Sequence, residues 1–129
     1  KNEVIGVDIS GSKIGGDVDG SIVIFPDPMG ATGGTICEAI SHYKKHVDGK
    51  AKRYISAHLI ITPEYIQKIQ KLHPDCEVYT IRLDRGLSSK EALNSDPGER
   101  IEEEKGLNKN QYIIPGAGGV GELLNNSFV

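Results

Sequence analysis

Apolar and polar residues follow one another in blocks through the middle of the chain, between residues 22 and 83. Short apolar runs are separated by longer segments in which apolar residues recur every three or four positions. Runs of the first kind are typical of buried strands, and segments of the second kind are typical of amphipathic helices. Their alternation predicts an α/β fold with a parallel sheet and helices on both of its faces.

The first strand is expected at 21–25 (SIVIF), because Pro26 ends the apolar run. A glycine-rich loop follows, and Gly33-Gly34-Thr35 opens a helix that Asp48-Gly49 ends. The apolar face of this helix is formed by Ile36, Ile40, Tyr43 and Val47.

A second strand is predicted at 54–61 (YISAHLII). Thr62-Pro63-Glu64 then has the N-cap, the first-turn proline and the first-turn acid that are typical of a helix start. This helix runs to about Leu72, and a third strand is predicted at 77–83 (EVYTIRL). The apolar face of the helix is formed by Ile66 and Ile69, with Leu72 or Tyr65.

The pattern is weaker outside this region. Residues 4–9 (VIGVDI) have the composition of another strand, and 11–20 that of a turn or loop. Residues 88–111 are strongly charged, with a turn at Asp96-Pro97-Gly98 between two short helices, and we interpret them as a surface insertion that takes no part in chemistry. Its acidic run 102–104 is expected to be a solvated helix face.

Length and composition favour one domain of 129 residues, of which 37% are hydrophobic. The net charge of −3 disfavours nonspecific binding to nucleic acid, and no apolar run is long enough to cross a membrane. Cys37 and Cys76 stand alone without metal-ligand spacing, so we expect reduced thiols in a cytoplasmic protein. Because the chain begins with Lys1, we expect a part upstream of it.

The four histidines, at positions 42, 46, 58 and 73, are scattered without the spacing of a triad or zinc site. His58 lies inside a predicted strand, which favours a satisfied core histidine. Asp84-Arg85 lies at a strand end, and we expect it to form a local ion pair rather than to contact substrate.

The loop between the first strand and the first helix, FPDPMGATGGT, is the most informative segment for function. Amides at residues 31–35 can converge on a phosphate at the helix N-terminus, and the hydroxyls of Thr32 and Thr35 add donors. No lysine follows the glycines, so this is not a Walker A loop. Asp27, at the strand end, is suitably placed to accept hydrogen bonds from sugar hydroxyls.

A second glycine-rich segment, GAGGVG at 116–121, fits the spacing G-x-G-x-x-G. A dinucleotide-binding fold would need a helix and an acidic residue about 20 positions later, and only eight residues remain. A tight turn or a loop that contacts a base remain as interpretations of this segment.

Three segments together resemble the uracil phosphoribosyltransferases, a family of type I phosphoribosyltransferases. PDPMGATGGT is similar to the family's D-P-M-x-A-T-G-G-[ST] loop, LHPDCEVYTIRLDRGL to its H-P-D-x-E-x-Y-T-x-x-x-D-x-G-L stretch, and YIIPGAGGVGE to its C-terminal Y-I-x-P-G-x-G-D-A-G-D loop. The matches occur in family order over about residues 21–122 and correspond to the C-terminal part of the family.

The resemblance implies transfer of a phosphoribosyl group from phosphoribosyl pyrophosphate to uracil, giving UMP and pyrophosphate with the help of Mg²⁺. It also implies a type I core with a small hood from the C-terminal segment, and a homodimer. No metal-binding residue is assigned. Asp27 would hold ribose hydroxyls and act as the catalytic carboxylate. The phosphoribosyl-binding residues implied are Asp27, Pro28, Met29, Gly30, Ala31, Thr32, Gly33, Gly34 and Thr35, and the uracil-binding residues are Ile113, Gly118, Gly119 and Val120.

The chain departs from the family pattern at two glycines. Gly30 replaces a leucine, which should loosen the loop, and Gly119 replaces an aspartate, which removes a carboxylate. Residues 1–20 show no upstream pyrophosphate loop. Two alternatives therefore stay open: a nucleotide-sensing domain without catalysis, and a phosphoribosyltransferase for another base.

Overall fold

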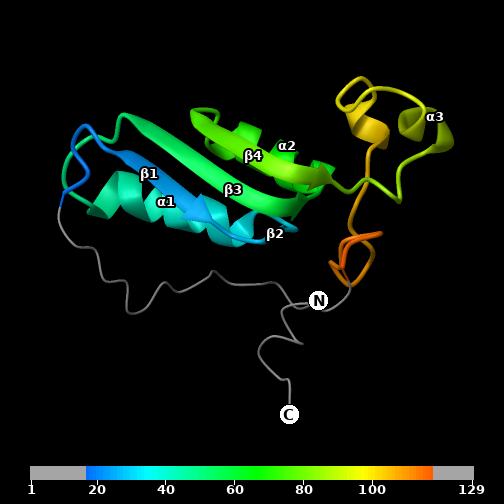
Figure 1. Cartoon of the computed structure of the whole chain (residues 1–129), viewed down its shortest axis with the longest axis horizontal. Helices are drawn as coiled ribbons and strands as arrows, with labels where there is room; N and C mark the ends of the chain where they lie inside the picture. Colours follow the sequence, from blue (N-terminus) through cyan, green and yellow to red (C-terminus); the bar gives the residue numbers. More distant parts are fainter. Residues whose placement is uncertain (1–16, 118–129) are drawn as a thin grey trace, which may run out of the picture.

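The computed structural model describes residues 17–117 (Figure 1). Its elements are β1 (Ile22–Pro26), β2 (Met29–Gly30), α1 (Gly34–His46), β3 (Arg53–Ile61), α2 (Pro63–Leu72), β4 (Cys76–Leu83), α3 (Lys90–Leu93) and the 3-10 helix η1 (Ile101–Glu103). The strands and helices predicted between residues 21 and 83 are confirmed, with ends that shift by one or two residues. The possible strand at 4–9 lies outside the described residues.

The sheet is parallel and is centred on β3. β1 pairs with the first half of β3, from Ile22↔Arg53 to Pro26↔Ala57, and the two residues of β2 pair with its end. β4 pairs with β3 from Tyr54↔Cys76 to Ile61↔Leu83. The carboxyl ends of the strands therefore meet at one edge, which is where open α/β sheets bind ligands.

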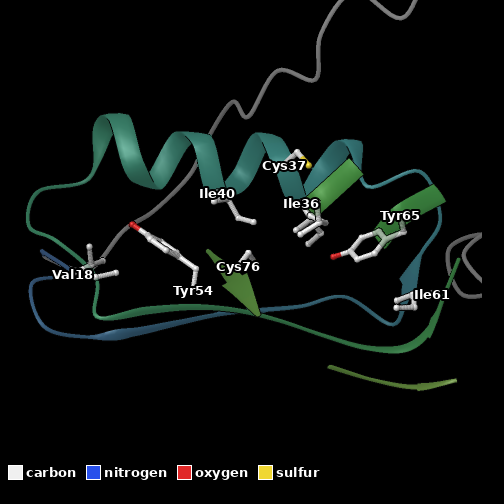
Figure 2. Packing of buried hydrophobic residues seen from close by; sticks show 10 residues of the cluster. Val18, Ile36, Cys37, Ile40, Tyr54, Ile61, Tyr65 and Cys76 are labelled. Atoms are coloured by element: carbon white, nitrogen blue, oxygen red, sulfur yellow. The ribbon is translucent and has the colours of Figure 1, made fainter. Parts of the chain in front are cut away.

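Both longer helices pack on the same face of the sheet. In a parallel register, paired residues point to the same side, so Tyr54, Ser56 and His58 share a face with Val23 and Phe25 of β1. Figure 2 shows α1 above this face, with apolar side chains filling the space between them. The buried cluster consists of Val18, Ile36, Cys37, Ile40, Ala51, Tyr54, Ile61, Tyr65, Ile69 and Cys76. Both cysteines are buried and free, as the sequence predicted.

The other face of the sheet carries large apolar side chains that stay exposed. They are Ile22, Ile24, Leu59, Tyr79 and Ile81, the last of which is 82% exposed. Within residues 17–117, no helix covers this face. The parallel α/β fold is thus confirmed, whereas this part of the chain shows helices on one face only.

α2 begins as the sequence predicts, because the Thr62 side chain accepts a hydrogen bond from the Tyr65 amide at 3.1 Å. Its buried face uses Tyr65, which is fully buried, and Ile69. Leu72 is 51% exposed, so Tyr65 is the correct choice of the two. No helix of the described residues is long and apolar enough to cross a membrane.

The charged segment after β4 is organised around Arg85. Its guanidinium donates to the carbonyls of Ala92 and Ser95 and pairs with the Glu104 carboxylate at 2.8 Å. Glu104 also accepts hydrogen bonds from the Gly98 amide, at the predicted turn. The prediction that the acidic run is a solvated face is therefore wrong for Glu104, whose side chain is 4% exposed. The prediction of a local ion pair at Asp84-Arg85 holds only for Asp84, which pairs with Arg82, because Arg85 pairs with the distant Glu104.

The same segment is fastened to α2. The Glu64 carboxylate accepts hydrogen bonds from the amides of Gly106 and Leu107 at 3.0–3.1 Å, and the Gln67 amide donates to the Ile101 carbonyl. A Cβ atom on Gly106 would lie 2.2 Å from the Asp84 carbonyl oxygen, so only glycine fits there. These contacts hold residues 101–107 against the core.

Candidate functional site

The glycine-rich loop lies at the carboxyl end of β1 and leads into α1. It lines a pocket of about 100 Å³, a size that suits a phosphate group rather than a whole nucleotide. Eight of the nine residues predicted for the phosphoribosyl site line this pocket, and the exception is Pro28. The remaining two lining residues are Ile36 of α1 and Tyr65 of α2.

The carbonyl groups of the loop are bonded to β3 and to the start of α2. The hydrogen bonds run from the amides of Leu59 and Ile60 to the Pro28 oxygen, from the Thr62 amide to the Gly30 oxygen, and from the Thr62 hydroxyl to the Ala31 oxygen. On the other side of the loop, the amides of Thr32, Gly33, Thr35 and Ile36 make no hydrogen bond within the described residues and are left available for an anion. The loop is therefore built to present positive partial charge.

The turn into α1 depends on Gly33, whose φ of 77° lies in the left-handed region that favours glycine. The Gly34 amide donates to the Thr32 hydroxyl oxygen at 3.3 Å, which leaves the hydroxyl hydrogen free to donate to a ligand. The first turn of α1 contains no acidic side chain that would compete with an anion.

Asp27 is held at three of its groups. Its amide donates to the Ala57 carbonyl at 3.0 Å, and its Oδ1 accepts from the Met29 amide at 3.1 Å. Its carbonyl oxygen accepts from Nδ1 of His58 at 2.6 Å. With these groups engaged, Oδ2 is left to accept hydrogen bonds from a ligand at the edge of the pocket.

His58 and Tyr65 form a buried pair behind this carboxylate. His58 donates through Nδ1 to Asp27, so its Nε2 accepts from the Tyr65 hydroxyl at 2.7 Å. Burial lowers the pKa of His58, and burial raises the pKa of Tyr65 to about 12, so the imidazole is neutral and the phenol keeps its proton at neutral pH. The prediction of a satisfied core histidine is confirmed, although its partner in the loop was missed.

Gly30 is explained by its neighbours. A Cβ atom on this residue would lie 2.8 Å from Cγ2 of Ile61 and 2.9 Å from Cδ2 of Tyr65. The Tyr65 ring therefore takes the space into which a larger residue at position 30 would extend. The expectation that Gly30 loosens the loop is wrong, because the glycine is tightly packed.

We expect Gly30→Leu to lower the free energy of unfolding by about 1–3 kcal/mol, as overpacking of a core typically does. Combining it with Tyr65→Ala should cost less than the sum of the two single changes, because the leucine can fill the vacated space. Urea denaturation of the three variants measures this coupling. Strictly additive losses would show that the two residues do not compete for space.

The segment that resembles the base-binding loop begins beside the end of β4. Ile113 is buried and forms an antiparallel bridge with Leu107. The Gly116 amide donates to Oδ2 of Asp84 at 2.7 Å. Gly118, Gly119 and Val120 lie outside the described residues, and Ile113 does not line the phosphate-loop pocket. The two halves of the predicted site are thus not brought together within residues 17–117.

A family model described as uracil phosphoribosyltransferase matches residues 8–100. The chain belongs to the uracil phosphoribosyltransferase family. A curated relative of that name from Shouchella clausii is 38% identical over 112 residues, which cover 87% of this chain and 43% of the relative. A second, from Thermococcus kodakarensis, is 34% identical over 100 residues, which cover 78% of this chain and 34% of the relative.

Among solved structures, the AQ2163 protein from Aquifex aeolicus is similar to this member of the family. It is 30% identical with a TM-score of 0.62, over 84% of this chain and 41% of that one. The chain therefore spans 34–43% of the length of these proteins. The family match includes the glycine-rich loop and the strands β1, β3 and β4.

Proposed function

We propose that the protein transfers a 5-phosphoribosyl group from phosphoribosyl pyrophosphate to N1 of uracil, forming UMP and releasing pyrophosphate. The observation that carries this proposal is the loop after β1, whose carbonyls are bonded to β3 and α2 while its amides and threonines line a phosphate-sized pocket. Membership of the uracil phosphoribosyltransferase family supports uracil as the base.

Positioning accounts for most of the proposed catalysis. Bond breaking at the anomeric carbon builds positive charge on the sugar ring, so the protein must fix the ribose and the leaving group and aim the base. The loop amides and Thr32 and Thr35 would hold the 5′-phosphate. Oδ2 of Asp27 would hold ribose hydroxyls, and its negative charge would stabilise the nearby cationic sugar. No covalent nucleophile is needed.

We propose that Mg²⁺ arrives with the pyrophosphate of the substrate. Mg²⁺ commonly binds through one or two carboxylates together with substrate phosphates and water. The described residues fit that mode, because they offer the Asp27 carboxylate at the pocket but no cluster of three or more acidic, histidine or cysteine side chains that could hold a metal. The ion would neutralise charge on the pyrophosphate while Asp27 orients the ribose.

The decisive experiment measures pyrophosphate release with uracil and with other nucleobases as acceptors. Release with uracil alone supports the proposal, and release with another base would reassign the acceptor. Binding of UMP without any release would instead indicate a nucleotide-sensing domain. We also propose that the protein is a cytoplasmic homodimer. Analytical ultracentrifugation measures the oligomeric state.

Gly119 provides a separate test, since the family's C-terminal loop pattern has an aspartate at this position. We expect the wild type to turn over and Gly119→Asp to change the rate of UMP formation by less than about 10-fold, because Glu122 or an upstream group supplies the carboxylate. A wild type without turnover, beside an active Gly119→Asp variant, would contradict this expectation. One well-placed polar group can change a rate by about 100-fold or more, so the two results are easily distinguished.

A further inference from the structure

α2 lies against the phosphate loop through two side chains one turn apart. The position of a Cβ atom on Gly33 is 3.4 Å from Cδ2 of Tyr65 and 3.5 Å from Cβ of Lys68. The corresponding position on Gly34 is 3.8 Å from Nζ of Lys68. The Lys68 ammonium therefore lies in van der Waals range of Gly34, at the N-terminal end of α1.

The charge of Lys68 is not neutralised by an ion pair within residues 17–117. Its expected partner on the same helix is Glu64, four residues earlier, since a Glu followed by a Lys at that spacing is a favourable pair. The Glu64 carboxylate instead accepts hydrogen bonds from the amides of Gly106 and Leu107. Because Glu64 binds the segment that follows η1, its carboxylate does not pair with Lys68.

Two sources of positive charge consequently meet at the loop. One is the N-terminal end of α1, where the amides of Thr35 and Ile36 are available and the first turn has no acidic residue. The other is the Lys68 ammonium, whose field reaches the Cys37 thiol on α1 and opposes the rise that burial causes in the pKa of that thiol. Lys68 does not itself line the pocket, but its ammonium lies beside Gly34, which does, so an extended Lys68 side chain would reach a dianionic phosphate bound there.

We propose that Lys68 is a phosphate-binding residue that supplies the cation missing from the loop's own sequence. The inference rests on the proposed function, because it assigns a ligand to the same 5′-phosphate. The ligand chemistry is a phosphomonoester dianion, recognised by a flexible ammonium group and a helix N-terminus together. The lysine comes from the helix after β3 rather than from the loop itself.

The test compares the affinities of UMP, uridine and inorganic phosphate by calorimetry for the wild type and three variants. Lys68→Gln removes the charge, Lys68→Arg keeps it, and Lys71→Gln is a matched control on the last turn of α2. Both positions, Lys68 and Lys71, are exposed on one helix, so the three variants should fold alike.

We expect Lys68→Gln to weaken UMP binding about 10-fold, the equivalent of one charge-assisted hydrogen bond reduced by solvent screening. Uridine binding should not change, and Lys68→Arg should restore most of the UMP affinity. The salt dependence of UMP binding should also become weaker in Lys68→Gln, because one cation no longer contributes. Lys71→Gln should resemble the wild type in all of these measurements.

Equal UMP affinity for Lys68→Gln and the wild type would overturn the inference and leave the proposed function intact. A parallel loss of uridine binding would also overturn it, since Lys68 would then act on the whole ligand rather than on the phosphate. A wild type that binds uridine as tightly as UMP would overturn the proposed phosphate site itself. If inorganic phosphate binds as tightly as UMP and with the same dependence on Lys68, the residue serves free phosphate, and its assignment to the nucleotide is wrong.

Discussion

Replacing Thr32 and Thr35 together by valine is expected to weaken UMP binding by about 3–6 kcal/mol, if each hydroxyl contributes about 1.5–3 kcal/mol to a charged phosphate. Both residues line the pocket after β1. The Thr32 oxygen already accepts a hydrogen bond from the Gly34 amide, so its hydrogen is free to donate to a ligand. Calorimetric titration with UMP measures the loss.

Thr80→Val is a suitable control for this double variant. The Thr80 hydroxyl, on β4, donates to the Leu59 and Arg82 carbonyls and does not line the pocket. Its removal should leave UMP affinity unchanged. Unchanged affinity in a folded Thr32 and Thr35 double variant would show that these hydroxyls do not contact the phosphate.

Glu104→Ala is expected to lower the free energy of unfolding by about 3–5 kcal/mol, because removing one partner of a buried ion pair leaves the other charge uncompensated. The Glu104 and Arg85 side chains are 4% and 16% exposed. The substitution also leaves the Gly98 amide without its acceptor. Urea denaturation measures the change, provided that the slope of the unfolding free energy against urea concentration is the same in both proteins.

Glu103→Ala is the matched control, because the Glu103 carboxylate forms an exposed pair with Arg100 and accepts a hydrogen bond from the Ser89 hydroxyl, with no buried charge among its partners. Exposed pairs contribute about 0–1 kcal/mol, so the control should be clearly milder. UMP affinity of the folded Glu104→Ala protein should be unchanged, since no residue of 88–104 lines the phosphate pocket. A loss of affinity would mean that this segment takes part in the site.

The sequence predicted the elements whose signal is local. The strands β1 and β3 are apolar runs, β4 alternates in character, and both long helices have spaced apolar faces, so neighbouring residues are enough to find them. β2 was not predicted, because it has only two residues and forms inside a loop by pairing with β3. The glycine-rich loop could also be found from the sequence, because its hydrogen-bond donors are adjacent in the chain.

Interactions between distant residues could not be predicted. Gly30 and Tyr65 are 35 positions apart, so the packing that requires a glycine leaves no pattern around either residue. Glu104 belongs to a run of three acids and was placed in solvent, although Arg85 buries it from 19 positions away. His58 was correctly interpreted as a core residue, but its hydrogen bond to Asp27 depends on how β3 pairs with β1.

The exposed face of the sheet has a consequence for heat capacity. Its five large apolar side chains contact water in the folded chain and also in the unfolded chain. The heat-capacity increase on unfolding comes from apolar surface that water newly reaches, so these side chains add little to it. A sheet covered on one face therefore gives a flatter curve of stability against temperature than one of equal length covered on both. For residues 17–117, the curvature of that dependence comes mainly from the single layer of contacts between the sheet and the helices α1 and α2, to which the buried Ala92 and Ile113 add a smaller part.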